Sequence, residues 1–207
     1  LPPEKRNVFV PENDYLVEFD FDAYHIRLIA DLIDFKHFGR ESVHEYLSHF
    51  YKCSYQESKA KTFRLLYGGI DEETRKKVPF FRRVHDYINK KWNEINTHNC
   101  VYTDIYRRKL TYNNYDDLNR NKLFNYLIQA YETESNIKKI LSIQDYLYNK
   151  KTKLVLYGYD SFLFDFSKQD GVEILTEIKN ILERENQLTK SKMGLNYGDM
   201  KDITKRL

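Results

Sequence analysis

Residues 15–21 read Tyr-Leu-Val-Glu-Phe-Asp-Phe, a stretch in which apolar side chains recur at every second position. A period of two residues is typical of a β-strand with one face in a core. Val17, Phe19 and Phe21 share the apolar face, so Asp20 points the other way near the end of the strand. The sequence therefore predicts a core strand that ends with a carboxylate.

A second apolar stretch, residues 154–166, is interrupted by Gly158-Tyr159-Asp160. Because Gly and Asp are favoured in turns, this interruption predicts two strands joined by a tight turn. Between the two stretches Gly and Pro are rare, and apolar residues recur at helical spacing. We expect helices at 22–33, 43–50, 54–68, 79–95, 118–148 and 171–185, and a short hairpin at 101–110. This order predicts an α+β fold in which a helical insertion separates the strands of a small sheet.

The composition excludes several classes of protein. Charged residues make up 31% of the 207 residues, and no apolar run approaches the roughly 18 residues of a membrane span. Cys53 and Cys100 are too few for a disulfide scaffold and lack zinc-site spacing, so we expect a reducing compartment. The net charge of +3 argues for no particular partner. The chain starts Leu1-Pro2-Pro3 without a signal-peptide pattern, and we expect it to be part of a longer polypeptide.

The carboxylates of Asp20 and Asp160 are the leading candidates for chemistry. Each belongs to an apolar strand region, where a charge is costly to bury unless it is paired or bound to a metal. If the strands pair, the acids repel each other, and a divalent cation removes that repulsion. Oxygen ligands suit Mg²⁺ or Mn²⁺, and two such ions can support an in-line phosphoryl displacement. The alternative is that Asp160 is simply a turn residue.

A cation and two aromatic residues, Lys59, Phe63 and Tyr67, share one face of the helix expected after Ser54. They could hold a phosphate and stack a base or sugar; the alternative is an amphipathic helix with both aromatics in the core. The basic run Arg107-Arg108-Lys109 could bind a backbone phosphate or form a solvated turn. The sequence lacks a zinc-type histidine pair, a nucleophile elbow and a phosphate-binding glycine loop.

Three motifs, in this order, resemble those of family A DNA polymerases, the DNA polymerase I type. Phe19–Arg27 resembles motif A, with Asp20 at the position of the metal-binding acid. Lys59–Gly68 fits the motif B pattern Lys-x-x-x-Phe-x-x-x-Tyr-Gly at every fixed position. Tyr157–Ser161 resembles motif C, with Asp160 at the second metal position. The resemblance spans nearly the whole chain.

Weaker similarities fill the gaps between these motifs. Arg6 stands where the family has an arginine that reads the minor groove of the primer–template, and His44 where a histidine lies near the nucleotide phosphates. Asn125 and Gln129 match a pair that lines the DNA near the primer end. Residues 194–198 resemble the closing Gly-x-Asn-Trp segment.

The resemblance implies the palm and fingers of such a polymerase, with a small antiparallel sheet and a helical fingers subdomain. It implies a palm formed by residues 1–35 and 113–207, with motif C inside 154–166. The fingers would comprise residues 36–112, with motif B inside 54–69.

The implied reaction is template-directed transfer of a nucleotide from a dNTP to a primer 3′ hydroxyl, with two Mg²⁺ ions or with Mn²⁺. Asp20, Asp160 and the carbonyl of Phe21 would hold the metals. The implied nucleotide-binding residues are His25, His44, Lys59, Phe63 and Tyr67, and the implied DNA-binding residues are Arg6, Asn125 and Gln129. We add Arg108, from the basic run, to the expected DNA-binding residues. The implied partners are primer–template DNA and dNTP, with no membrane, and with thumb and exonuclease domains upstream or on a separate chain. The implied location is the cytoplasm or nucleoid.

The chain departs from the family pattern at three positions. His25 replaces the motif A glutamate that crowds the sugar 2′ position, and we expect its imidazole to serve the same purpose. Tyr55 replaces an arginine one turn before Lys59, and Ser161 replaces the third carboxylate. A serine directly after the motif C aspartate, as Ser161 is here, resembles motif C of single-subunit RNA polymerases. An enzyme of that class therefore stays an alternative. A nucleic-acid-binding remnant without efficient catalysis is the other alternative.

Overall fold

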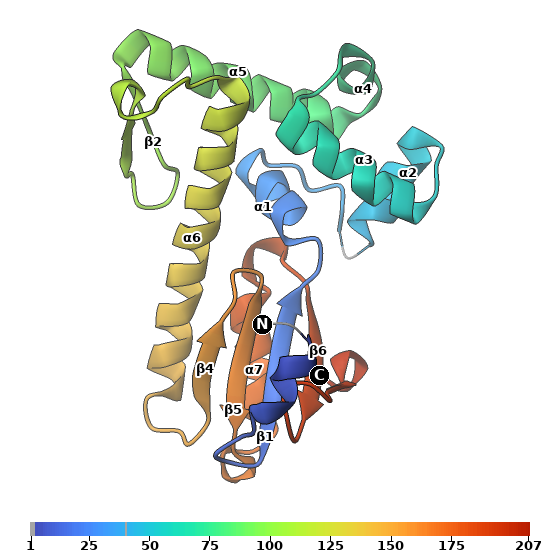
Figure 1. Ribbon diagram of the computed structural model, residues 1–207, viewed down its shortest axis with the longest axis vertical. Helices are drawn as coiled ribbons and strands as arrows, with labels where there is room; N and C mark the ends of the chain where they lie inside the picture. Colours follow the sequence, from blue (N-terminus) through green and yellow to red (C-terminus); the bar gives the residue numbers. More distant parts are fainter. Residues whose placement is uncertain (1–2, 40) are drawn as a thin grey trace. The chain divides into compact units, whose positions relative to one another are not determined.

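The computed structural model describes residues 3–39 and 41–207, and residues 1, 2 and 40 lie outside the described part (Figure 1). The chain forms two compact units. The first, which we call the sheet unit, comprises the chain up to Tyr24 and residues 136–207. The second, the helical unit, comprises residues 25–135. Each unit is described by itself below.

In the described residues of the sheet unit, five strands form one antiparallel sheet in the order β4-β5-β1-β6-β7. They are β1 (Tyr15–Phe21), β4 (Lys153–Tyr157), β5 (Ser161–Phe166), β6 (Thr189–Gly194) and β7 (Lys201–Asp202). The predicted strand at 15–21 and the predicted strand pair within 154–166 are confirmed. Because β1 lies between β5 and β6, both of its edges are paired, and on its apolar face Val17 and Phe19 are completely buried.

The apolar face of the sheet is built from aromatic rings. Phe19 packs edge-to-face on Phe164, and Phe21 does the same on Phe162, with ring centroids 5.7 and 5.9 Å apart. The helix α7 (Glu173–Leu182), drawn behind the sheet in Figure 1, contributes a buried stripe that includes Ile178. This core fixes β1 and β5, the two strands next to the predicted acids.

The strand β6, which lies between β1 and β7, was not predicted from the sequence. Its buried positions are polar, Thr189 and Ser191, and they alternate with exposed Lys190 and Lys192. The pattern has the period of a strand but lacks the apolar residues by which a strand is usually found. Only its pairing with β1 makes it part of the sheet.

The helical unit contains α2 (Val43–Tyr51), α3 (Tyr55–Gly68), α4 (Glu72–Lys77) and α5 (Pro79–His98), and the hairpin of β2 (Cys100–Tyr102) and β3 (Lys109–Thr111). Two helices cross from one unit to the other along the chain, α1 (Tyr24–Leu32) and α6 (Arg120–Leu147). Short 3₁₀ turns occur at Pro3–Val8, Tyr112–Asn114, Lys168–Asp170, Arg184–Asn186 and Thr204–Arg206. The predicted long helices and the hairpin are confirmed, whereas α4 was not expected.

Local sequence signals explain where the helices begin. Ser54 and Glu57 form the capping box that opens α3: the Glu57 N–H donates to the Ser54 hydroxyl, and the Ser54 N–H donates to the Glu57 carboxylate at 2.9 Å. Pro79 occupies the first turn of α5, where its missing N–H costs no helical hydrogen bond. Asp22 does not cap α1, because it lies two residues before the helix and its carboxylate binds Lys190 at 2.7 Å.

The two compact units divide at 24/25 and 135/136, whereas the palm and fingers segments implied by the resemblance divide at 35/36 and 112/113. Both boundaries of the helical unit fall inside helices, α1 and α6. A helix that continues through a boundary carries no Gly, Pro or change of period to mark it, so the division leaves no sign in the sequence.

In the described residues, no helix combines the length and apolar character that a bilayer crossing requires.

Candidate active site

The two predicted acids meet at one end of the sheet. Asp20 is the second-last residue of β1, and its register partner on β5 is Ser161. The N–H of Phe21 donates to the carbonyl of Asp160 at 2.8 Å, so the turn that carries Asp160 is tied to the end of β1. Asp20 is half-buried and Asp160 is exposed. The backbone therefore brings the two carboxylates to the same edge.

The electrostatics of this edge are unfavourable for a second negative charge. Burial raises the pKa of Asp20, and the nearby charges of Asp160 and Glu18 raise it further, against a smaller opposing effect of Lys192 and Lys190. Within the described residues, no hydrogen bond or close ion pair holds the Asp20 or the Asp160 carboxylate. A half-buried acid with carboxylate neighbours and no donors is the environment that a divalent cation stabilises.

The turn that presents Asp160 is tight and strained. The N–H of Gly158 donates to the carbonyl of Ser161 at 2.9 Å, and the Ser161 N–H donates back at 3.3 Å. Tyr159, between them, has a φ of +59°, in the left-handed region that favours glycine. A tyrosine in this region costs on the order of 1 kcal/mol or more, so the surroundings must hold the turn in place.

A buried asparagine of α6 supplies that hold. Asn136 is completely buried. Its amide group donates to the carbonyl of Tyr159 and to the hydroxyl of Tyr157, both at 2.8 Å, and its amide oxygen accepts from the Tyr24 hydroxyl. One side chain thus joins the start of α1 to the hairpin that carries Asp160. Asn136 was not among the predicted site residues.

The sheet also places a polar cluster beside Asp20. The hydroxyl of Tyr197 donates to the carboxylate of the buried Glu18 at 2.9 Å, and Lys192 lies 3.8 Å from the same carboxylate. Burial, together with Glu18, raises the pKa of Tyr197 to about 12. The guanidinium of Arg6 lies over the Tyr197 ring, 4.9 Å from its centroid. Arg6, a predicted DNA-binding residue, is therefore attached to the face of the sheet that carries Asp20.

In the helical unit, three of the predicted nucleotide-binding residues are brought together. The rings of Phe63 and Tyr67 are stacked on α3, with centroids 6.2 Å apart and planes 6° from parallel. The Tyr67 hydroxyl lies 2.5 Å from Nδ1 of His25, and Nε2 of His25 lies 3.1 Å from a carboxylate oxygen of Glu132. Lys59 is exposed two turns earlier on α3. Glu132 was not among the predicted residues.

His44 differs from the other nucleotide-binding candidates because its side chain is only 4% exposed. Its ring lies against Tyr55 and Phe63, with centroids 5.6 and 6.2 Å away, and its carbonyl accepts from the hydroxyl of Ser58 at 2.8 Å. The ring therefore belongs to the packing between α2 and α3. A phosphate could reach it only if that packing opened, and no feature of the local sequence indicates this burial.

Arg108 is held by an acid that was not predicted from the sequence. The buried Glu134 of α6 accepts from Nε of Arg108 and from the hydroxyl of Thr103, each at 2.7 Å, and from the N–H groups of Ile105 and Tyr106. Burial pushes the pKa of Glu134 upward, but these donors outweigh it, and the pKa lies below its ordinary value. The hairpin that carries Arg108 is thus fixed to α6.

The two remaining DNA-binding candidates lie one turn apart on α6. Gln129 is exposed, whereas Asn125 is half-buried. The side-chain oxygen of Asn125 is buried and has no hydrogen-bond partner within the described part of the chain. The unpredicted site residues of this helix lie further along it. Polar Glu132 and Asn136 continue, at intervals of four, the buried stripe of Ile128, and this is the signal that could have identified them.

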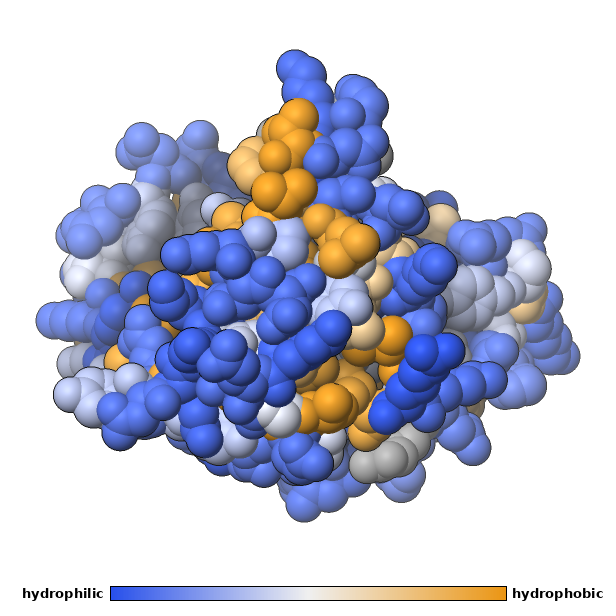
Figure 2. Space-filling model, turned by 90° about the horizontal axis from the view of Figure 1, so that it is seen from below, coloured by the Kyte–Doolittle hydropathy of each residue, from blue (hydrophilic) through white to orange (hydrophobic). Residues whose placement is uncertain are grey.

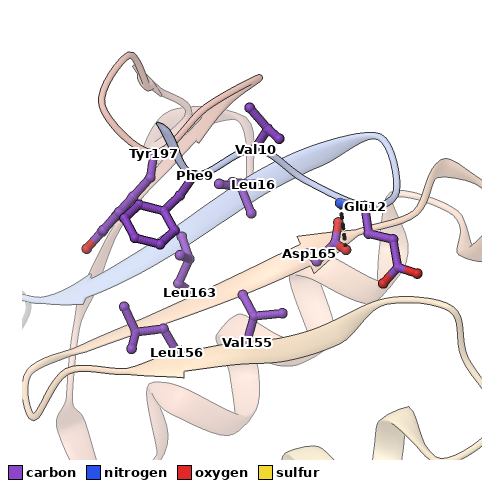
Figure 3. A pocket seen from close by; sticks show the side chains of 9 residues that line it. All are labelled: Phe9, Val10, Glu12, Leu16, Val155, Leu156, Leu163, Asp165 and Tyr197. Carbon is purple, nitrogen blue, oxygen red and sulfur yellow. Dashed lines mark hydrogen bonds between the residues drawn. The ribbon is translucent and has the colours of Figure 1, made fainter. Parts of the chain in front are cut away.

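A shallow apolar groove of about 330 Å³ opens on the face of the sheet that bears Leu16 (Figure 3). Leu163 forms its floor with Leu16, and half-exposed Val155 and Leu156 lie along one side. Seen from below, the surface is mostly hydrophilic, with patches of apolar side chains (Figure 2).

Within the described residues, no group of three or more His, Cys, Asp or Glu side chains is gathered as a metal site would need. A metal would therefore depend on the Asp20–Asp160 pair and backbone oxygens.

No protein-family model matches the chain, and no curated protein sequence is similar to it. Among solved structures, the chain is similar to the POL domain of Pol1 from M. smegmatis, in complex with a DNA primer–template and dNTP. The TM-score is 0.75 and the sequence identity 16%, over 95% of this chain and 42% of that chain. The chain thus spans less than half the length of the chain it matches. The fold of the chain is therefore similar to that of a POL domain.

Proposed function

We propose that the chain is the nucleotidyl-transfer part of a template-directed DNA polymerase. The observation that carries the proposal is that Asp20 and Asp160 lie at the same end of the sheet, without hydrogen-bond donors among the described residues, in a fold similar to a POL domain. The similar structure binds a primer–template and dNTP, and we infer the same two partners for this chain. In the proposed reaction the primer 3′ hydroxyl attacks the α-phosphate of the dNTP, and pyrophosphate leaves.

The donor set suits Mg²⁺, with Mn²⁺ as a substitute, because it offers only oxygen atoms. Asp20 and Asp160 would hold the ions, with the carbonyl of Phe21 as a further ligand. Bound divalent cations supply charge neutralisation for the triphosphate and activation of the attacking hydroxyl. The raised pKa of Asp20 supports this assignment, because a nearby cation would relieve the repulsion that raises it.

The helical unit would bind the incoming nucleotide. Lys59 is exposed and free to place its ammonium against a phosphate. The stacked rings of Phe63 and Tyr67 offer a flat apolar surface for the sugar and the nascent base pair. His25, bound to Tyr67, would crowd the 2′ position of the sugar and so favour dNTP over rNTP. Positioning and charge neutralisation are most of what phosphoryl transfer requires from a protein.

Residues of both units would contact the DNA. Arg6 and Arg108 carry positive charge for the phosphate backbone; Arg6 lies over the Tyr197 ring, and Arg108 donates to Glu134. Gln129 is exposed on α6, one turn from Asn125, and could reach a base edge or sugar. Thumb and exonuclease domains, if the protein uses them, would come from a further part of the protein or a separate chain.

The test is extension of a labelled primer on a DNA template by the protein. We expect incorporation of the complementary dNTP that requires Mg²⁺ and stops on chelation. Asp20→Asn should abolish it, and Asp145→Asn should not, because Asp145 is an exposed acid near the end of α6 and belongs to none of the three motifs. Extension that continues at the wild-type rate in Asp20→Asn would refute the proposed site.

A second candidate, an RNA polymerase of the single-subunit class, is favoured by Ser161, which follows Asp160 where DNA polymerases of family A have a carboxylate. The same assay separates the two, because that enzyme would extend the primer with rNTP in preference to dNTP. A protein that binds the primer–template but extends it with neither nucleotide would be the catalytically inactive remnant.

A further inference from the structure

Glu132 and Tyr67 hold His25 between them, and all three residues belong to the helical unit. His25 Nε2 lies 3.1 Å from a Glu132 carboxylate oxygen, and Nδ1 lies 2.5 Å from the Tyr67 hydroxyl. The side chain of Glu132 is 9% exposed and that of His25 is 31% exposed. The acid thus lies behind the ring, and the ring keeps an open surface.

For a neutral His25 ring, the chemistry of the three groups fixes the hydrogen atoms. A carboxylate can only accept, so the hydrogen between Glu132 and His25 belongs to Nε2. A neutral imidazole with its hydrogen on Nε2 has a lone pair on Nδ1, which accepts from the hydroxyl of Tyr67. Burial and the charge of Glu132 raise the pKa of Tyr67, so the phenol keeps the hydrogen that it donates. The chain of donors therefore runs from Tyr67 through His25 to Glu132.

We propose that Glu132 is a positioning residue for sugar selection, which fixes the tautomer and the plane of His25 and commits the Tyr67 hydroxyl to the histidine. The proposal rests on the function proposed above, in which His25 crowds the 2′ position of the nucleotide. The family motif has a single glutamate at this wall of the sugar pocket. This chain has a histidine instead, and Glu132, 107 residues away in the sequence, holds it in place. Hydrogen-bond partners behind a functional side chain commonly fix its tautomer in this way.

The first test reads the tautomer directly and needs no activity. Nitrogen-15 NMR of the histidine-labelled protein distinguishes a ring protonated on Nε2 from one protonated on Nδ1, and loss of the signal in His25→Ala assigns it among the six histidines. We expect the Nε2-protonated form in the wild type and a mixture of forms in Glu132→Ala. A wild-type ring protonated on Nδ1, or a tautomer unchanged in Glu132→Ala, would overturn the proposal.

The second test measures sugar choice in single-nucleotide incorporation. His25→Ala should lower the ratio of dNTP to rNTP efficiency by tens-fold, since a lost steric contact supplies about 10- to 200-fold discrimination. Glu132→Ala should lower it by about tenfold, mainly through faster use of rNTP, with dNTP use nearly unchanged. Glu132→Gln, whose amide oxygen can still accept from Nε2, should restore most of the ratio. Asp145→Ala is the control on the same helix and should leave the ratio unaltered.

Two comparisons separate this role from a merely structural one. Because Glu132 acts through His25, Glu132→Ala should have no further effect on the ratio in the His25→Ala background. Additive losses in the double variant, or equal losses of dNTP and rNTP use in Glu132→Ala, would show instead that Glu132 only supports the fold. If the protein extends no primer, the proposed function fails, while the NMR measurement still decides whether Glu132 sets the tautomer.

Discussion

Two acids of this molecule, one in each unit, have opposite surroundings. Asp20 at the end of β1 is half-buried, has carboxylate neighbours and no hydrogen-bond donor in the described structure, and its pKa is raised. Glu134 on α6 is almost completely buried, accepts four hydrogen bonds, and its pKa is lowered. An acid saturated by its own protein stabilises the fold, whereas an acid left unsatisfied costs stability and remains available to a ligand.

The same contrast separates the ways in which the two units build their sites. In the sheet unit, backbone pairing and one buried asparagine place the acids, so the geometry follows from main-chain hydrogen bonds. In the helical unit, side chains reach one another across helices, as His25, Tyr67 and Glu132 do. Substitutions in the first unit should therefore remove chemistry, and those in the second should change selectivity and affinity by degrees.

The largest expected effect is on catalysis at the unsatisfied acids. Asp20→Asn or Asp160→Asn should reduce single-nucleotide incorporation by about a thousandfold or more, because a metal ligand supplies several kcal/mol of transition-state stabilisation. Binding of the primer–template, measured by fluorescence anisotropy, should be nearly unchanged. If incorporation falls by less than tenfold in both variants, the difference in surroundings between Asp20 and Glu134 is unrelated to catalysis.

A smaller effect is expected for the exposed cation of the helical unit. Lys59→Ala should lower kcat/KM for the incoming dNTP by about ten- to a hundredfold, as one charge-assisted contact worth about 1.5–3 kcal/mol is lost. Lys76→Ala is the matched control, since Lys76 is exposed on α4 and already paired with Glu72. Steady-state kinetics in which both variants behave like the wild type would mean that Lys59 is only a solvated residue.

The saturated acid should show its effect in stability instead. Glu134→Gln should lower the free energy of unfolding by about 1–3 kcal/mol, because an amide cannot accept all the bonds that the carboxylate accepts. Since the folded pKa of Glu134 is depressed, its contribution is present above the ordinary glutamate pKa and is lost as the pH falls through the folded pKa. Denaturant titration of both proteins at several pH values checks this. A difference that grows on acidification would contradict the assignment.

The smallest expected effect is on the stability of the protein when Asp20 is replaced, and here the substitution should stabilise the fold. Because the pKa of Asp20 is raised, its charged form is disfavoured on folding and lowers the stability of the protein at neutral pH. This loss of stability declines as the pH falls through the folded pKa and is gone below the ordinary pKa of aspartate. Asp20→Asn, although inactive, should therefore have a higher Tm than the wild type at pH 7, and the gain should vanish in acid. For a chain of this length, each 1 kcal/mol corresponds to about 2–4 °C. A lower Tm at neutral pH would show that Asp20 is a structural acid like Glu134.

Features that depend on neighbouring residues follow directly from the sequence. The alternation in 15–21 set β1, Ser54 and Glu57 set the start of α3, and Gly158 with Asp160 set the turn of the hairpin. Each of these follows from short-range sterics and hydrogen bonds, which a few consecutive residues specify. The positions of Asp20 at a strand end and Asp160 in a turn therefore follow from the local sequence alone.

The distant groups that complete the site come together only in the folded chain. Thr189 and Ser191 belong to an inner strand because β1 pairs with them, and His44 is buried because α2 packs on α3. Glu132 meets His25 from 107 positions away, and Asn136 meets the Tyr159 turn from 23. A buried polar residue of a helix has the same spacing as an apolar one, so its partner depends on how the chain folds back. Asp20 and Asp160 could therefore be identified from the sequence, whereas Glu132 and Asn136, whose partners lie far away along the chain, could not.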